Sequence, residues 1–444
     1  MSKILLSGGC VLTLGAKTPN FTRADVLIDD GVVAEVGQSL RAREAELVDA
    51  TDTVVMPGFV DTHRHAWRSL FRNLGDGGPG SGGQTGSEAS GDRLLPEDVY
   101  VATLVGLLGA IEAGITTVVD WSPIRSDEAV DAALHAHADA GLRTVFVHAP
   151  GTGDEDHGRA AAAFRELVPR LTDTAGPLTT IAFGSRISGA NDLARVELDW
   201  TVARELGLRI HAHADADTSG AGAIAELARR SLLAKDVTLV HCSSLENEDV
   251  EAIASSGASV SLASSSAIAD LMGTPPIQSL IDRDIRPGLG IDEEQLTPGD
   301  LFAQMRATIS MQHATVFDRK LAGKAGVPRL MSTRDVIRHA TVDGARAAGL
   351  GAVTGSLEPG KQADIIMLRT DRPNIFPIND PIGAVVWGMD TSNVDHVFVS
   401  GRAVMRGGVL DADAAHARNL ATVARRRMTE SSGATLGTLS AGGA

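Results

Sequence analysis

The chain is poor in cysteine, in aromatic residues and in long apolar runs. Its 444 residues include 2 Cys, 10 Phe, 4 Trp and 1 Tyr. Two cysteines cannot build a disulfide framework, so we expect a reducing, cytoplasmic location. The longest apolar stretch, residues 99–111, is shorter than the ~18 residues that a membrane span needs. The apolar run at residues 4–6 is too short for a signal peptide and is expected to be a first β-strand. Because no run is long enough to span a membrane, we expect no membrane partner.

Basic residues are outnumbered by acidic ones. The chain has 40 Lys and Arg against 56 Asp and Glu, a formal net charge of −16. Binding to nucleic acid requires a basic face, so the charge balance argues against a nucleic-acid partner. A content of 43% apolar and 22% charged residues is ordinary for a folded globular protein. We therefore expect a folded globular protein without a nucleic-acid partner.

Short apolar strands separated by turn residues occur at both ends of the chain. They lie at residues 3–7, 11–14, 25–28, 32–36, 46–49 and 53–56, and again at 364–368, 396–400 and 404–406. Each group is too small to bury a core of its own. We therefore expect one small β-sandwich domain formed from both chain ends.

Between the two ends, apolar strands alternate with helical patterns. The strands are expected at residues 54–60, 115–120, 143–148, 178–184, 208–213, 237–241, 259–263 and 285–292, and helices at, for example, 96–113, 127–140, 193–206 and 247–256. Eight strands with intervening helices fit an α/β fold of the (β/α)8 TIM-barrel type better than an open doubly wound sheet. The expected domains are 1–56 and 354–409 for the two halves of the β-sandwich, 57–353 for the barrel, and 410–444 for a helix and a flexible tail.

Residues 75–91 are dominated by Gly and Ser and cannot hold regular structure. They follow the first barrel strand, so we expect a loop over the carboxyl-terminal mouth of the barrel. Two interpretations stay open for this loop: a lid, or an insertion without a role.

Six chemically active side chains lie at the carboxyl ends of predicted barrel strands: His63 and His65 on the first, His211 and His213 on the fifth, His241 on the sixth and Asp292 on the eighth. On an extended chain residues i and i+2 point to the same side, so His63 and His65 can bind one ion. The carboxyl ends of parallel barrel strands meet at one face, where barrel enzymes carry their chemistry. Imidazole nitrogen and carboxylate oxygen are good ligands for zinc and iron(II). The sequence therefore predicts a site for one divalent metal ion, Zn²⁺ in the first place or Fe²⁺.

The sequence His-Ala-His-Ala-Asp-Ala occurs twice, at residues 135–140 and 211–216. The first copy lies in a helical pattern that ends at Gly141. On a helix, residues i and i+2 are ~200° apart and cannot bind one ion. We therefore expect His135 and His137 to be surface or packing residues.

These residues resemble the metal signature of the amidohydrolase superfamily. The match consists of Pro57-Gly-Phe-Val-Asp-Thr-His-Arg-His65, the histidine of strand five, His241 and Asp292. Within the superfamily the chain is most similar to the cytosine deaminase-like branch, which includes adenosylhomocysteine deaminases and triazine hydrolases. Segments 111–120, 340–345 and 355–364 support this resemblance. It implies a barrel flanked by a split β-sandwich and a homo-oligomer. It also implies a single metal ion, because residues 180–186 lack the bridging lysine of two-metal members.

The sequence departs from this pattern on strand five. Members that deaminate usually carry His-x-x-Glu there, and the Glu moves protons to and from the substrate. With His213 as the metal ligand, the corresponding residue is Ala216, and with His211 it is Ala214. We take His213 as the ligand, and Asp215, Asp217 or Glu293 could replace the missing Glu.

A metal ion held by His63, His65, His213 and Asp292 could lower the pKa of a bound water to about 7. Asp292 would accept the proton of that water, and His241 would orient the water or polarise the group under attack. We therefore expect a hydrolase of a C–N bond in a small cyclic or amidine-containing molecule, most simply an aminohydrolase. Two alternatives stay open: another metal-dependent reaction, such as ring opening, dehalogenation or a lyase step, and a non-catalytic barrel used for assembly.

Weaker candidates for contact with the substrate are Arg72, Trp67, His148, Arg186, His211, Asp215 and Glu293. Arg72 and Trp67 could instead pack the base of the loop that follows the first metal motif, or form a subunit contact. The acidic residues at 215, 217, 293 and 294 would form an acidic rim, either for a cationic substrate or simply solvated. Residues 264–266 are expected in a turn, and Cys242 is expected to point away from the metal because adjacent strand residues alternate sides.

Overall fold

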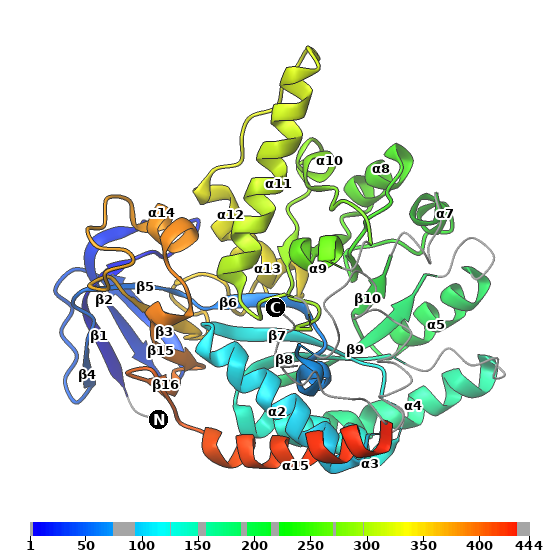
Figure 1. The fold of residues 1–444 in the computed structure, drawn as a ribbon, viewed down its shortest axis with the longest axis horizontal. Helices are drawn as coiled ribbons and strands as arrows, with labels where there is room; N and C mark the ends of the chain where they lie inside the picture. Colours follow the sequence, from blue (N-terminus) through cyan, green and yellow to red (C-terminus); the bar gives the residue numbers. More distant parts are fainter. Residues whose placement is uncertain are drawn as a thin grey trace, which may run out of the picture.

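The computed structural model of the chain describes residues 3–73, 94–124, 126–149, 157–187, 193–214, 222–269, 272–295 and 297–432. Figure 1 shows a barrel surrounded by helices, with a second sheet at its side. In this part of the chain, no helix is both long enough and apolar enough to cross a membrane. The loop expected at 75–91 and most of the expected flexible tail lie outside the described residues.

The barrel is an eight-stranded parallel sheet within the described residues. Its strands are β6 (Phe59–Arg64), β7 (Ile115–Ser122), β8 (Arg143–His148), β9 (Thr179–Arg186), β10 (Ile210–His213), β11 (Val237–Val240), β12 (Ser259–Leu262) and β13 (Gly288–Leu289). The helices between and after them are η1 (Ala66–Phe71), α2 (Pro96–Glu112), α3 (Asp127–Ala140), α4 (His157–Thr174), α5 (Leu193–Glu205), α7 (Ala223–Arg229), α8 (Asn247–Ser256), α9 (Ser264–Ala269), α10 (Ile277–Ile281), α11 (Leu301–Leu321), α12 (Thr333–His339) and α13 (Val342–Ala347). The predicted (β/α)8 barrel is confirmed.

Backbone hydrogen bonds around Asp292 close the barrel between its first and last strands. The amide of Asp292 donates to the carbonyl of His63 over 2.8 Å, and the amide of His65 donates to the carbonyl of Asp292 over 3.0 Å. Gly290 permits this close approach, because a Cβ atom there would lie 2.9 Å from the backbone of His63. The segments that carry His63, His65 and Asp292 are thus held side by side.

Strands from both chain ends form a nine-stranded sheet in the described residues. The first group is β1 (Ile4–Val11), β2 (Phe21–Asp29), β3 (Val32–Gly37), β4 (Glu46–Asp49) and β5 (Thr53–Pro57), and the second is β14 (Ile365–Arg369), β15 (Val394–Val399), β16 (Arg402–Arg406) and β17 (Val409–Leu410). The antiparallel pairing of β14 with β5 joins the two groups. A β-domain built from both ends is therefore confirmed.

Short helices and one long helix complete the chain. They are α14 (Pro381–Gly383), η3 (Ala384–Gly388), η4 (Thr391–Asn393) and α15 (Ala414–Ser432). Helix α15 lies along α2 at the bottom of Figure 1. The guanidinium of Arg427 binds Glu97 there over 2.9 Å.

The strand predicted at residues 54–60 is in fact two strands in two sheets. β5 ends at Pro57 in the nine-stranded sheet, and β6 begins at Phe59 in the barrel. At Gly58, between them, a Cβ atom would lie 2.2 Å from the side chain of Thr116. Both strands are buried, so a continuous apolar run gives no sign of the change of sheet. The strand predicted at residues 285–292 is likewise shorter, because only Gly288–Leu289 pairs regularly.

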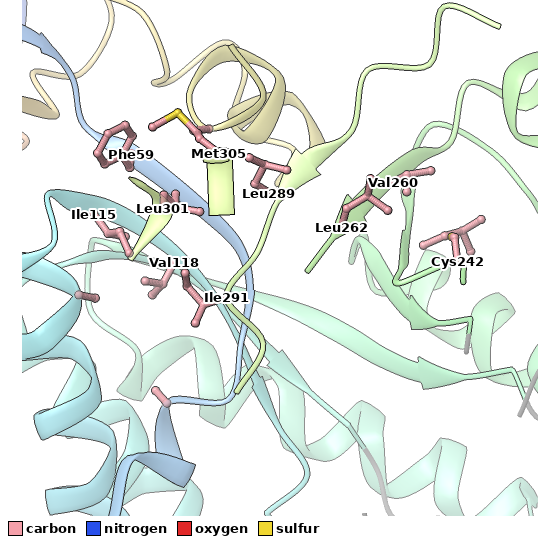
Figure 2. Close-up of a cluster of buried hydrophobic side chains, with 14 of the residues drawn as sticks. Phe59, Ile115, Val118, Cys242, Val260, Leu262, Leu289, Ile291, Leu301 and Met305 are labelled. Carbon is pink, nitrogen blue, oxygen red and sulfur yellow. The ribbon is translucent and has the colours of Figure 1, made fainter. Parts of the chain in front are cut away.

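An apolar core fills the space between the barrel strands and the surrounding helices. Figure 2 shows part of it, including Phe59 and Leu289. The ring of Phe59 packs edge-on against Phe302 of α11, with ring centroids 5.0 Å apart. Cys242 is buried in this core, as predicted, and takes part in no disulfide. The reducing compartment inferred from the cysteine count stays a prediction.

Candidate active site

Four histidines and one carboxylate converge at the carboxyl ends of the barrel strands. The Nε2 atoms of His63 and His65 lie 3.2 and 3.3 Å from Oδ1 of Asp292. His213 Nε2 lies 3.0 Å from His63 Nε2, and His241 Nε2 lies 3.9 Å from Oδ2 of Asp292. All five side chains are buried. The structure thus brings together five of the six strand-end side chains that the sequence singles out, all but His211.

The donor atoms of this cluster fit a divalent metal ion. Candidate ligand atoms lie within 4.8 Å of one another in two overlapping groups, His63 with His213 and His241, and His63 with His65 and Asp292. Burial holds the pKa of His65 and His213 well below the ordinary value, so both rings stay neutral with a lone pair to offer. Neutral imidazole and carboxylate are the ligands that zinc and iron(II) accept. A cation among them would also compensate the burial of these polar atoms.

Asp292 is ionised and fixed in direction. Burial alone would raise its pKa, but the charge of His241 and hydrogen bonds from His63 and His65 hold the pKa well below the ordinary value. The hydroxyl of Ser266 donates to Oδ2 over 2.9 Å. The backbone of Asp292 has φ = 66°, in the left-handed region that non-glycine residues seldom adopt. Such strained positions concentrate at functional sites.

Ser266 is a residue that sequence reasoning missed. The turn expected at residues 264–266 is wrong, because these residues begin helix α9. The signal in the sequence is weak, since three consecutive serines after a strand are typical of a turn. Only the three-dimensional structure distinguishes the serine that reaches Asp292 from its neighbours.

Trp121 is a second residue that the sequence did not single out. It lies in β7, is fully buried, and stacks on the ring of His213 with centroids 4.1 Å apart and planes 10° apart. The stacking fixes the plane of the imidazole ring. It also covers one face of His213 with apolar surface, which keeps water away.

Arginines that follow the first metal motif bind the acidic residues that follow Asp292. Arg68 forms an ion pair with Glu293, and the Nε of Arg72 donates to Glu294 over 2.6 Å. The side chains of Glu293 and Glu294 are only 12% and 10% exposed. The expectation of a solvated acidic rim is therefore wrong for these two residues, because arginines neutralise them.

Arg64 extends this ion-pair network into the barrel. Its guanidinium binds Glu294, donates to Asp61 over 2.7 Å and donates to the carbonyl of Gly299 over 2.9 Å. Burial opposes the charge of Arg64, but Glu294 and Asp61 raise the pKa of the guanidinium above its ordinary value. Asp61 in turn accepts a hydrogen bond from the amide of Ile291 over 3.0 Å. The network thus ties the first metal motif to the segment that carries Asp292.

The remaining substrate candidates lie in different surroundings. Trp67 is buried in an apolar cluster with Phe71, which favours a role in packing the base of the loop. His148 is buried against Phe164, and burial lowers the pKa of His148 to about 4. Arg186 ends β9 and lies in register with His213. Asp215 and Asp217 lie outside the described residues.

His211 and His213 differ in their position relative to the cluster. His213 offers its Nε2 to the cluster, whereas His211 belongs to neither of the two groups of candidate ligands. His211 is buried two residues nearer the amino end of β10, and so lies deeper in the barrel. The arrangement favours His213 as the ligand.

The first copy of the repeated hexapeptide lies on helix α3, as predicted. His135 is exposed, and His137 is buried with its Nε2 2.8 Å from Oδ2 of Asp120. The other oxygen of Asp120 accepts a hydrogen bond from the amide of Ala66 over 2.8 Å. His137 is therefore a packing residue that contacts the site only through Asp120.

The model of the amidohydrolase family matches residues 54–404 of this chain. The chain belongs to the amidohydrolase family. This amidohydrolase is thus a metal-dependent hydrolase of C–N bonds, as the sequence predicted. Strand β9 contains no lysine.

Similar proteins span almost the whole amidohydrolase. A 5'-deoxyadenosine deaminase of Methanothermobacter thermautotrophicus is 27% identical, over 92% of this chain and 94% of its own. A 5-methylthioadenosine/S-adenosylhomocysteine deaminase of Syntrophobacter fumaroxidans is 28% identical, over 90% and 92% of the two chains.

Solved structures share the fold at lower identity. An adenosine deaminase of Xanthomonas campestris with bound zinc has a TM-score of 0.83 and 22% identity, over 97% of this chain and 99% of its own. The atrazine chlorohydrolase of Arthrobacter aurescens with zinc has a TM-score of 0.82 and 20% identity, over 95% and 100% of the two chains.

Proposed function

We propose that this amidohydrolase is a zinc-dependent aminohydrolase that releases ammonia from an amino-substituted purine. The observation that carries the proposal is the buried cluster of His63, His65, His213 and Asp292. Relatives named as deaminases of 5'-deoxyadenosine and of S-adenosylhomocysteine support an aminopurine substrate. The amino-bearing ring of such a molecule contains the amidine group that the sequence predicts. Solved neighbours that hold zinc support the choice of metal.

His63, His65, His213 and Asp292 would hold the zinc ion. Zinc, when bound, supplies Lewis acidity and a source of hydroxide near neutral pH. The carboxylate of Asp292, whose Oδ1 lies 3.2 Å from Nε2 of His63, is the group in the cluster that is placed to accept a proton. Ser266 keeps one oxygen of this carboxylate in place. His241, whose Nε2 lies 3.9 Å from Oδ2 of Asp292, is placed to orient the group under attack.

An aminohydrolase also needs a residue that delivers a proton to the leaving amine. Glu293 binds Arg68, and Glu294 binds Arg64 and Arg72. Both carboxylates are therefore engaged by arginine side chains in the structure. Asp215 and Asp217 are the two sequence candidates that remain for this role.

A second candidate reaction is the displacement of a group other than ammonia, such as chloride, or a ring opening or lyase step. The absence of Glu at the third position after His213 favours it, because deaminating members of the family usually carry that residue. The fold shared with an atrazine chlorohydrolase shows that this scaffold is compatible with such chemistry in another protein.

The test is ammonia release by the zinc-loaded protein from 5'-deoxyadenosine, 5'-methylthioadenosine and S-adenosylhomocysteine, with chloride release from a chlorotriazine measured in parallel. We expect ammonia from at least one aminopurine. The variant His213→Ala should lose this activity, whereas His135→Ala, in the other copy of the hexapeptide, should keep it. Chloride release without ammonia from any aminopurine would favour the second candidate and overturn deamination.

A further inference from the structure

The outward face of helix α11 carries an uncharged stripe. Figure 1 shows that α11 extends away from the barrel. The stripe consists of residues spaced alternately four and three apart: Ala303, Ala307, Ser310, Ala314, Phe317 and Leu321. Phe317 and Leu321 are 58% and 70% exposed, whereas Met305 and Ile309 on the opposite face are buried in the core. This spacing is the one by which two helices pack against each other along a seam.

The stripe is complementary to itself. Its small residues lie toward the amino end of α11, and its large ones lie toward the carboxyl end. If two copies of α11 pack antiparallel, Leu321 faces Ala303 and Phe317 faces Ala307, in the same register. Large side chains then fill the space above small ones, as close packing requires. An unrelated partner would not need this symmetric order, so the pattern favours a second copy of the chain.

Exposed apolar side chains also flank the small half of the stripe. Ile268 on α9 is 46% exposed, and Trp387 on η3 is 49% exposed. Helix α9 adjoins one side of α11, since the amide of Ser265 donates to the side chain of Gln304 over 3.1 Å. The segment of η3 adjoins the other side, where Arg306 donates to backbone carbonyls. A partner's Phe317 and Leu321 would pack on the small half of the stripe, and exposed apolar side chains therefore lie on both sides of that position.

We propose that the stripe on α11 is a self-interaction surface, through which two copies of the chain form a two-fold dimer with antiparallel α11 helices. The carboxyl end of α11, at Leu321, would then lie beside the amino end of the other subunit's α11, where Asp300 caps the helix.

The oligomeric state of the full chain tests the surface. We expect a dimer by sedimentation equilibrium, and a dissociation constant raised at least about 100-fold in the double variant F317E/L321E. Val423→Glu is the matched control, because Val423 is 57% exposed on α15, and it should remain dimeric. Circular dichroism should show that both variants are folded. A monomeric wild-type chain at tens of micromolar, or a double variant that stays dimeric, would overturn the proposal.

Cysteine cross-linking tests the register. In the antiparallel pair, residue 307 of one chain faces residue 317 of the other. The double variant A307C/F317C therefore places one cysteine of each chain within the Cα separation that a disulfide needs. Positions 307 and 317 lie about 15 Å apart along one helix, so neither single variant should cross-link. We expect a covalent dimer on a non-reducing gel only for the double variant. No covalent dimer in the double variant, or one in F317C alone, would overturn the antiparallel register.

Discussion

The hydroxyl of Ser266 donates a hydrogen bond to Oδ2 of Asp292 over 2.9 Å. The other oxygen of the carboxylate is thereby turned toward the Nε2 atoms of His63 and His65. Partners that orient a ligand in this way fix its geometry and tune its basicity. Ser266 is therefore a positioning residue that acts through Asp292.

Replacing Ser266 by Ala should weaken zinc binding or lower kcat by about 10- to 100-fold, because Asp292 loses its fixed direction. Activity of the zinc-loaded protein and zinc content after dialysis measure the two effects. Ser264→Ala is the matched control, since that hydroxyl contacts Thr308 at 2.9 Å and not Asp292. Equal losses in the two variants would show that the effect is structural.

Replacing His213 by Ala should remove the bound metal, whereas replacing His211 by Ala should leave it in place. The physical reason is that the Nε2 of His213 faces His63, while His211 lies outside the candidate ligand groups. Elemental analysis of the purified variants gives the stoichiometry directly. Near-stoichiometric zinc in the His213 variant would contradict the assignment.

Asp61→Asn should lower the free energy of unfolding by about 3 kcal/mol, because it removes one partner of the buried Arg64 guanidinium. Urea unfolding at neutral pH measures this change. Glu205→Gln removes a partner of Arg165 from an ion pair whose two side chains are about half exposed, and should cost less than about 1 kcal/mol. Comparable losses in both variants would contradict a special role of the buried pair.

The stability of the protein should fall below pH 6.5 in part because of His148. Burial lowers the pKa of this histidine to about 4 in the folded chain, whereas an unfolded histidine titrates near 6.5. Between these values the unfolded chain binds the proton more readily, so the free energy of unfolding decreases as the pH is lowered, by up to about 3 kcal/mol. His148→Phe should make urea unfolding less dependent on pH between 6.5 and 4. Identical slopes in the variant and the wild type would show that His148 does not contribute.

Most of the fold could be predicted because apolar periodicity is a local property. Strand β8 and helix α3 lie at the residues predicted, since apolar side chains and turn residues mark their ends. The change of sheet at Gly58 could not be predicted, because it depends on contact with Thr116 from a distant part of the chain. The shortness of β13 could not be predicted either. The left-handed backbone at Asp292 depends on pairing with Arg64 of β6, which is distant in the sequence.

The grouping of the candidate ligands could be predicted because strand geometry brings residues i and i+2 to the same side, as it does for His63 and His65. The neighbours that orient the ligands could not. Trp121 reaches His213 across the barrel, and Ser266 reaches Asp292 from a helix that the sequence shows as a turn. The neutralisation of Glu293 by Arg68 also depends on contacts between distant segments.

The two copies of His-Ala-His-Ala-Asp-Ala have different local structures but converge on one site. In the second copy, His213 faces the cluster directly. In the first, His137 binds Asp120, and Asp120 holds the amide of Ala66, the residue after His65. A motif search that treats the two hexapeptides as equivalent would predict two metal sites. A search that ignores repeated sequences would miss both the direct role of His213 and the indirect role of His137. In this enzyme the backbone conformation, helix or strand, decides whether the same six residues provide a ligand or a support for one.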